Sequence, residues 1–103
     1  MKYVEQLAAD IYVAVHGCPM PDGERLLYLF YAGLALAVGT AATPEQVHDA
    51  WSAWACWQRG EHPCLRPFDE LAPHVRKRDE PYAKAIRTVM AQRGKAQSSG
   101  EER

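Results

Sequence analysis

The sequence lacks the short motifs that identify common classes of enzyme. It contains no Walker-type phosphate loop, no Gly-x-Gly-x-x-Gly turn and no Gly-x-Ser-x-Gly elbow. The acids Asp69 and Glu70 are adjacent in the chain and do not form an obvious acid/base pair. We therefore predict that the protein is not an enzyme, that it has no catalytic residue, and that it holds no cofactor.

Long apolar runs and a leader sequence are also missing. The longest apolar stretch, Leu26–Val38, is shorter than the roughly 20 residues that a membrane-spanning helix needs. The first residues, Met1–Glu5, run directly into a mixed polar and apolar pattern and do not resemble a signal peptide. These absences predict a cytoplasmic protein with no membrane partner.

Cysteine is scarce, and its three copies cannot all pair in intramolecular disulfides. Two His-x-Cys pairs, His16 with Cys18 and His62 with Cys64, raise the question of zinc. Structural zinc sites usually separate paired ligands by two to four residues, so this spacing predicts no metal site and favours buried, unreacted cysteines. A catalytic dyad of Cys64 with His48 or with His62 is left as an alternative.

The pattern of apolar residues predicts a small all-α bundle of about four helices. We expect these helices near residues 3–15, 24–38, 44–57 and 80–93, in a single domain over residues 1–93. An irregular His-Pro-x-Leu-x-Pro loop should separate the last two helices, with a single turn at 68–71. Residues 94–103 have no apolar face and are predicted to be a disordered tail.

The start of the third helix has the clearest local signal. Thr43 supplies a hydroxyl for the N-cap, Pro44 suits the first helical position, and Gln46 stands where the second partner of a capping box belongs. Gly39 and Gly60 are predicted to end the second and third helices.

The net charge is small, but the charged residues are unevenly distributed. The formal net charge is −1, yet residues 76–93 hold six basic and two acidic side chains, a local charge of about +4. Such a segment is either a solvated helix face or a small site for phosphate or another anion, to which Arg76, Lys77 and Arg78 would contribute. Duplex nucleic acid is not expected as a partner, because the remainder of the chain is acidic.

Three tryptophans lie on one side of the third predicted helix, at Trp51, Trp54 and Trp57. A stripe of this kind usually packs into the core, which is the role favoured for Trp54. Three indoles exceed what so small a core requires, so at least one should lie at a rim and stack on a planar ligand. Trp51, which is nearest to His48, is the candidate.

Two segments of the chain resemble the ryanodine-receptor repeat domain (RyR domain). They are a His-x-x-Trp element in Val47–Trp51 and a Pro-x-Leu-x-Pro-aromatic-x-x-Leu element in His62–Leu71, followed by the basic Lys77–Asp79. The resemblance covers about residues 43–93. It implies an all-α module that binds adenine nucleotide through tryptophans and, in prokaryotic and phage versions, senses or sequesters nucleotide-derived signals in antiviral defence.

Two functions are therefore expected as alternatives. The first is non-catalytic binding of a nucleotide or a cyclic nucleotide, as a sensor or a sequestering protein in bacterial or phage defence or counter-defence. Its site would use eight residues: Trp51 against the base, assisted by Trp54 or Trp57; His48 and His62 on ribose or phosphate; and Arg76, Lys77 and Arg78 on phosphate. The second is a protein-interaction or homo-oligomeric assembly module without a small ligand, favoured by the apolar excess of so short a chain.

Overall fold

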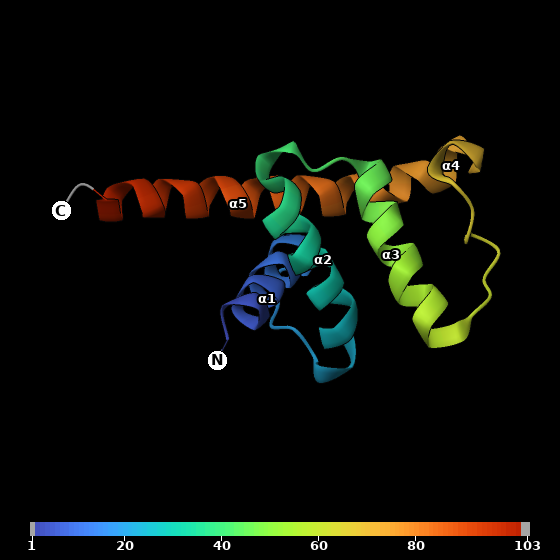
Figure 1. The fold of residues 1–103 in the computed structure, drawn as a ribbon, viewed down its shortest axis with the longest axis horizontal. Helices are drawn as coiled ribbons and strands as arrows, with labels where there is room; N and C mark the ends of the chain where they lie inside the picture. The colour runs from blue at the N-terminus through green and yellow to red at the C-terminus, as the bar shows by residue number, and fades with distance from the viewer. Residues whose placement is uncertain (1, 102–103) are drawn as a thin grey trace.

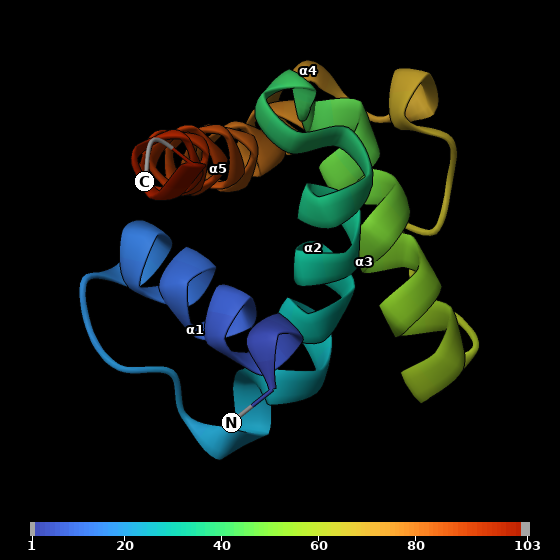
Figure 2. The same ribbon diagram turned by 60° about the vertical axis from the view of Figure 1, so that its left-hand side comes forward.

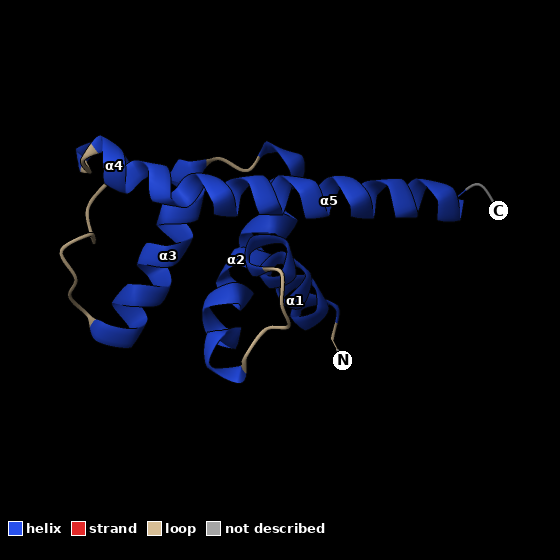
Figure 3. Cartoon of the chain, turned by 180° about the vertical axis from the view of Figure 1, so that it is seen from behind, coloured by secondary structure: helices blue, strands red, loops and turns tan. Residues whose placement is uncertain are grey.

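Four α-helices of three turns or more make up most of the chain. In a computed structural model, which describes the backbone of residues 2–101 and their side chains except at positions 59 and 95–101, they are α1 (Tyr3–His16), α2 (Arg25–Val38), α3 (Pro44–Arg59) and α5 (Glu80–Glu101). The described part contains no β-strand (Figure 3). The predicted all-α class is confirmed.

The longest helix, α5, forms one edge of the molecule. The helices α1, α2 and α3 all lie on the same side of α5 (Figure 1), and the C-terminal part of α5 projects beyond them. A second view shows α2 between α1 and α3 (Figure 2). Accordingly, α2 packs against both α1 and α3, while α5 packs against α1 and the 3₁₀ turn Gly39–Ala41.

The core lies where α1, α2 and α5 meet. Leu7 and Ile11 of α1, Ala32 of α2, Val47 of α3 and Ile86 of α5 are fully shielded from solvent. Alanines at several of the core positions allow the helix axes to approach closely, so that a short chain can bury its few large side chains together.

The helix boundaries follow local sequence signals. The Thr43 side chain accepts a hydrogen bond from the Gln46 backbone N–H at 3.2 Å, and the Gln46 side chain accepts one from the Thr43 N–H at 3.0 Å. This confirms the capping box. Gly39 and Gly60 end α2 and α3 with φ of 59° and 79°, a region that glycine enters without steric cost.

The segment between α3 and α5 contains more structure than the sequence indicated. The expected single turn is present as a 3₁₀ turn at Phe68–Glu70, but it is followed by a short helix, α4 (Pro73–Arg76), and a further 3₁₀ turn at Lys77–Asp79. Pro73 at the first position of α4 suits a helix start. These turns bring Lys77–Asp79 against α3, far from where an extended loop would leave it.

The last helix starts at Glu80, as predicted, and its backbone continues through Gly94 to Glu101. Glycine costs about 1 kcal/mol in a helix interior, and the good helix formers Lys95, Ala96 and Gln97 follow it directly. The disordered tail expected from residue 94 stays a prediction, and its last two residues, 102–103, lie outside the described part.

No helix in the described range combines the length and the apolar character that crossing a lipid bilayer requires.

Candidate ligand-binding site

A pocket of about 310 Å³ lies where α2, α3, the loop after α3 and the start of α5 converge. Aromatic, apolar and charged side chains from distant parts of the chain line it. They are Leu27, Tyr31, His48, Trp51, His62, Cys64, Val75, Arg78, Asp79 and Tyr82. Its volume is near the lower end of the range of about 300–1,000 Å³ for small-molecule sites, so it has room for one heterocycle with a sugar.

The indole of Trp51 forms one wall of the pocket. It is partly buried and packs on its inner side against the core. The His48 ring is stacked beside it, with ring centroids 5.8 Å apart and 22° between the planes. The His62 ring meets it edge-on, at 5.1 Å and 81°. Trp51 therefore has the rim position predicted for it.

His48 is fixed from two sides and is almost completely buried, with 3% of its surface exposed. Its Nε2 lies 2.7 Å from the carbonyl oxygen of Arg66, which can only accept, so Nε2 carries the proton and donates. Its Nδ1 then faces Asp79, at 4.0 Å from Oδ2. The Nε2–H is used by the Arg66 carbonyl, and Nδ1 is turned toward Asp79 at a distance too long for a hydrogen bond, so the arrangement does not support the predicted hydrogen bond from His48 to a ribose or phosphate. His48 instead positions its neighbours.

Asp79 places a carboxyl group in the pocket. Burial raises the pKa of this carboxyl to about 6, and the nearby His48 ring opposes the shift. The side chain retains 16% of its exposure. The carboxyl is therefore largely desolvated yet still accessible from the pocket.

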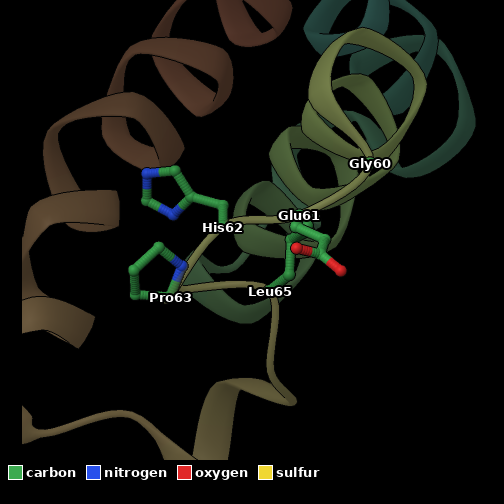
Figure 4. A pocket seen from close by; sticks show the side chains of 5 residues that line it. All are labelled: Gly60, Glu61, His62, Pro63 and Leu65. Carbon is green, nitrogen blue, oxygen red and sulfur yellow. The ribbon is translucent and has the colours of Figure 1, made fainter.

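His62 connects the pocket to a second, more open hollow of about 670 Å³, which is lined by loop residues alone. In Figure 4, His62 and Pro63 project to one side of the loop, and the Glu61 side chain points to the other. The His62 Nδ1 accepts a hydrogen bond from the Cys64 backbone N–H at 3.0 Å. Since Nδ1 is occupied as an acceptor, Nε2 carries the proton and remains a donor for a ligand. This agrees with the binding role predicted for His62.

The predicted site residues are only partly brought together. His48, Trp51, His62 and Arg78 line the pocket. Trp54 is half-buried and lines an adjacent hollow of about 270 Å³, which it shares with Trp51 and His62. Trp57 is 70% exposed and is not part of either lining. Arg76 and Lys77 lie next to Arg78 in the chain but do not line the pocket.

The cationic segment divides into two parts with different roles. The Arg87 guanidinium donates to the Ala42 carbonyl at 2.8 Å and pairs with Glu80 at 3.0 Å, so it ties α5 to the α2–α3 connection. Arg93 lies 3.9 Å from Asp10 of α1. Arg87 and Arg93 thus connect α5 to other parts of the fold, whereas Arg78 is the basic residue of this segment that lines the pocket.

Sequence reasoning missed the residues that close the pocket from the other helices. Tyr31 of α2 and Tyr82 of α5 lie with ring centroids 5.7 Å apart, and the sequence had indicated only that they were surplus aromatic surface. Asp79 was also missed, although it stands directly after the basic Arg76–Arg78. An acid that directly follows three consecutive basic residues was the available signal for it.

Among the side chains that the structure describes, no three His, Cys, Asp or Glu residues gather closely enough to hold a metal ion. Among these described residues, His16 and Cys18 therefore do not combine with His62 and Cys64, and Cys18 is exposed rather than buried as expected.

Comparison with known families assigns the chain. A family model described as "Domain of unknown function (DUF7701)" matches residues 2–91. The chain belongs to this family. No curated protein and no solved structure gives a significant match.

The resemblance to the ryanodine-receptor repeat domain was therefore wrong. The DUF7701 match includes both segments that carried the resemblance and also extends over the first forty residues. In this fold the two segments have structural roles. His48 donates to the backbone of Arg66 in the loop, and Leu71 is buried at the end of the 3₁₀ turn.

Proposed function

We propose that this DUF7701 protein is a non-catalytic binding protein for a nucleotide. The observation that carries the proposal is a small aromatic pocket, with Trp51 as a wall, that also contains the arginine Arg78. An aromatic wall suits the flat face of a base, and a guanidinium suits a phosphate oxygen. The pocket volume of about 310 Å³ favours one base rather than a dinucleotide.

The energies of these contacts are sufficient only if the base is also buried. Stacking on an aromatic ring contributes about 1–3 kcal/mol, and one charge-assisted hydrogen bond about 1.5–3 kcal/mol. A micromolar complex requires about 8 kcal/mol. The remaining free energy would come from covering the apolar surface of Leu27, Val75 and the two tyrosines, at about 25 cal/mol per Å².

A binding role without catalysis agrees with the way the histidines are used. The Cys64 thiol lines the pocket, but the His48 nitrogens face Arg66 and Asp79. The His62 Nδ1 accepts from the backbone of Cys64 itself. The two His48 nitrogens and the His62 Nδ1 are therefore not arranged to remove a proton from the Cys64 thiol, which supports a non-catalytic site.

We propose nucleotide binding only, without a role in defence or a choice of base at this point. A role in bacterial or phage defence, and recognition of adenine in particular, rested on the resemblance that the family match overturned. Nothing in the pocket residues replaces that support.

Thermal melts of the intact protein with a panel of nucleotides test the proposal. The panel contains adenine and guanine mononucleotides, cyclic dinucleotides and ADP-ribose derivatives. A bound nucleotide should raise the melting temperature, and the shift should grow with the logarithm of its concentration once the site is saturated. Trp51→Ala should abolish the shift, whereas Trp57→Ala, which truncates an exposed indole on the same helix, should preserve it.

Arg78→Gln provides a second test that leaves the core intact. It should weaken binding of a mononucleotide more than binding of the matching nucleoside, since only the former carries phosphate. Lys84→Gln makes the same charge change at an exposed position of α5 away from the pocket and should have no effect. Absence of a shift with every nucleotide would overturn the proposal.

Self-association as an assembly module is the second candidate. The observation that favours it is the exposed indole of Trp57, near the end of α3. This candidate predicts a melting temperature that rises with protein concentration and loses that dependence in Trp57→Ala. The same two variants therefore separate the two functions.

A further inference from the structure

Asp79 is the one carboxylate among the lining residues of the pocket, and an acid is an unexpected group in a site for an anionic ligand. Its carboxyl is mostly buried and keeps 16% of its exposure, on the pocket side. Within the described residues, its contact is the His48 Nδ1 at 4.0 Å, which is longer than a hydrogen bond. A desolvated acceptor of this kind is costly unless something donates to it.

His48 holds this carboxyl in a fixed place. The Nε2–H donates to the Arg66 carbonyl at 2.7 Å, the Ser52 hydroxyl lies 3.4 Å from the same nitrogen, and the ring is stacked beside Trp51. The imidazole therefore cannot rotate freely, and its Nδ1 faces Asp79 from α3. A polar group that is oriented by such a rigid neighbour can select a ligand by hydrogen-bond geometry.

Aromatic side chains from three helices line the pocket together with Asp79. Trp51 comes from α3, Tyr31 from α2 and Tyr82 from α5. Burial raises the pKa of both tyrosine hydroxyls, so these remain neutral groups that can donate. A flat heterocycle between these rings would present its edge, rather than its face, to the carboxylate.

A carboxylate accepts two hydrogen bonds side by side and donates none. The Watson–Crick edge of guanine offers two such donors, the ring N1–H and the 2-amino group. The same edge of adenine offers one donor beside a ring nitrogen whose lone pair would oppose the carboxylate. Resting on the proposed function, we propose that Asp79 reads the donor edge of guanine, so that the pocket selects guanine nucleotides over adenine nucleotides.

An organic cation is the other ligand that an aromatic pocket with a carboxylate could attract. Arg78 argues against it, because its positive charge lies in the same lining and the neighbouring Arg76 and Lys77 add to it. A base with two donors on one edge and a phosphate at the other end satisfies both Asp79 and Arg78.

Calorimetric titration of the whole protein with three purine monophosphates at pH 7.5 tests this inference. Guanosine monophosphate has both donors, inosine monophosphate has only the ring N–H, and adenosine monophosphate has neither in the required arrangement. We expect affinity to fall in that order, with at least about a tenfold difference between guanine and adenine, as expected when a buried acceptor loses its donors.

Asp79→Asn should remove this preference, because an amide presents one donor and one acceptor, which suits adenine better than guanine. Asp49→Asn is the matched control, since it makes the same change at an exposed position of α3 outside the pocket lining and should retain the guanine preference. A thermal melt of each variant confirms that it is folded.

The outcomes separate this inference from the proposed function. Equal affinities for the three nucleotides, a preference for adenine, or an unchanged preference in Asp79→Asn would overturn the role of Asp79 and leave nucleotide binding intact. Binding of an organic cation such as tetramethylammonium but of no nucleotide would overturn both, as would no binding of any nucleotide.

Discussion

Two neighbouring clusters of histidine and aromatic rings, connected through Tyr31 and Tyr82, use similar residues differently. In the first, the His16 ring of α1 and the Tyr28 hydroxyl of α2 are joined by a hydrogen bond of 2.8 Å, and Tyr12 packs against both rings. In the second, His48 and Trp51 of α3 stand beside the pocket. We call them the Tyr28 cluster and the Trp51 cluster.

The difference lies in where the polar atoms of each cluster find partners. In the Tyr28 cluster the His16 Nε2 and the Tyr28 hydroxyl are hydrogen-bonded to each other. In the Trp51 cluster His48 bonds to the backbone of Arg66 and leaves the Asp79 carboxyl without a close donor. Similar side chains are thus hydrogen-bonded to each other in the Tyr28 cluster, whereas in the Trp51 cluster they surround a carboxyl group without a close donor.

The largest expected effect tests whether the Tyr28 cluster is structural. Tyr28 is 2% exposed, and its ring contacts Tyr12 and Tyr31 edge-on. Tyr28→Ala should lower the free energy of unfolding by about 3–5 kcal/mol, as for other large aromatic truncations in cores. Urea denaturation measures it, with the 66% exposed Tyr3 truncated in Tyr3→Ala as the control. A loss no larger than the control's would contradict a structural role.

A smaller effect is expected in the Trp51 cluster, where removing the charge of Asp79 should raise the stability of the protein rather than lower it. The folded protein holds the Asp79 proton up to about pH 6, whereas an ordinary aspartate releases it near 3.8. The folded state binds more protons between these values, so stability is lost as the pH rises from about 4 to about 6. The loss is at most about 3 kcal/mol, at 1.36 kcal/mol per pKa unit.

Asp79→Asn should therefore be more stable than the native protein above pH 6, and the difference should shrink toward pH 4. The groups that face Asp79 are His48 from α3, Tyr31 and Tyr82 from α2 and α5, and the neighbouring Arg78. Melting temperatures of both proteins across this range measure the difference. A difference in melting temperature that does not depend on pH would show that burial of the Asp79 charge is not the cause of that difference.

The smallest effect isolates the hydrogen bond of the Tyr28 cluster. Tyr28→Phe keeps the ring and removes the hydroxyl that bonds His16 at 2.8 Å. Because His16 is exposed and can bond to water instead, we expect a loss of only about 1 kcal/mol in the free energy of unfolding. Paired denaturation curves of the two proteins measure it. A loss comparable to that of Tyr28→Ala would mean that the bond, and not the ring packing, holds this cluster.

The elements of the fold were largely predictable because their signals are local. The capping box at Thr43, the glycines at 39 and 60 and the start of α5 at Glu80 are each decided by a few consecutive residues. The short helix α4 was missed because four residues are too few for a periodic pattern.

The candidate site was predictable only in part, for a related reason. Periodicity placed Trp51 on the correct face of its helix, but it could not show that Trp57, two turns later on the same stripe, is left 70% exposed. Neither could it show that the two nitrogens of His48 face residues 18 and 31 positions away, Arg66 and Asp79.

The sequence alone determined the all-α class, the helix ends and the concentration of positive charge near Arg78, because each depends on neighbours in the chain. Only the tertiary structure decided that Tyr31, Trp51, Asp79 and Tyr82 share one pocket, because these residues come from separate elements that meet through packing. The family was found by matching residues 2–91 as a whole, because the short motifs within them were too weak to find it.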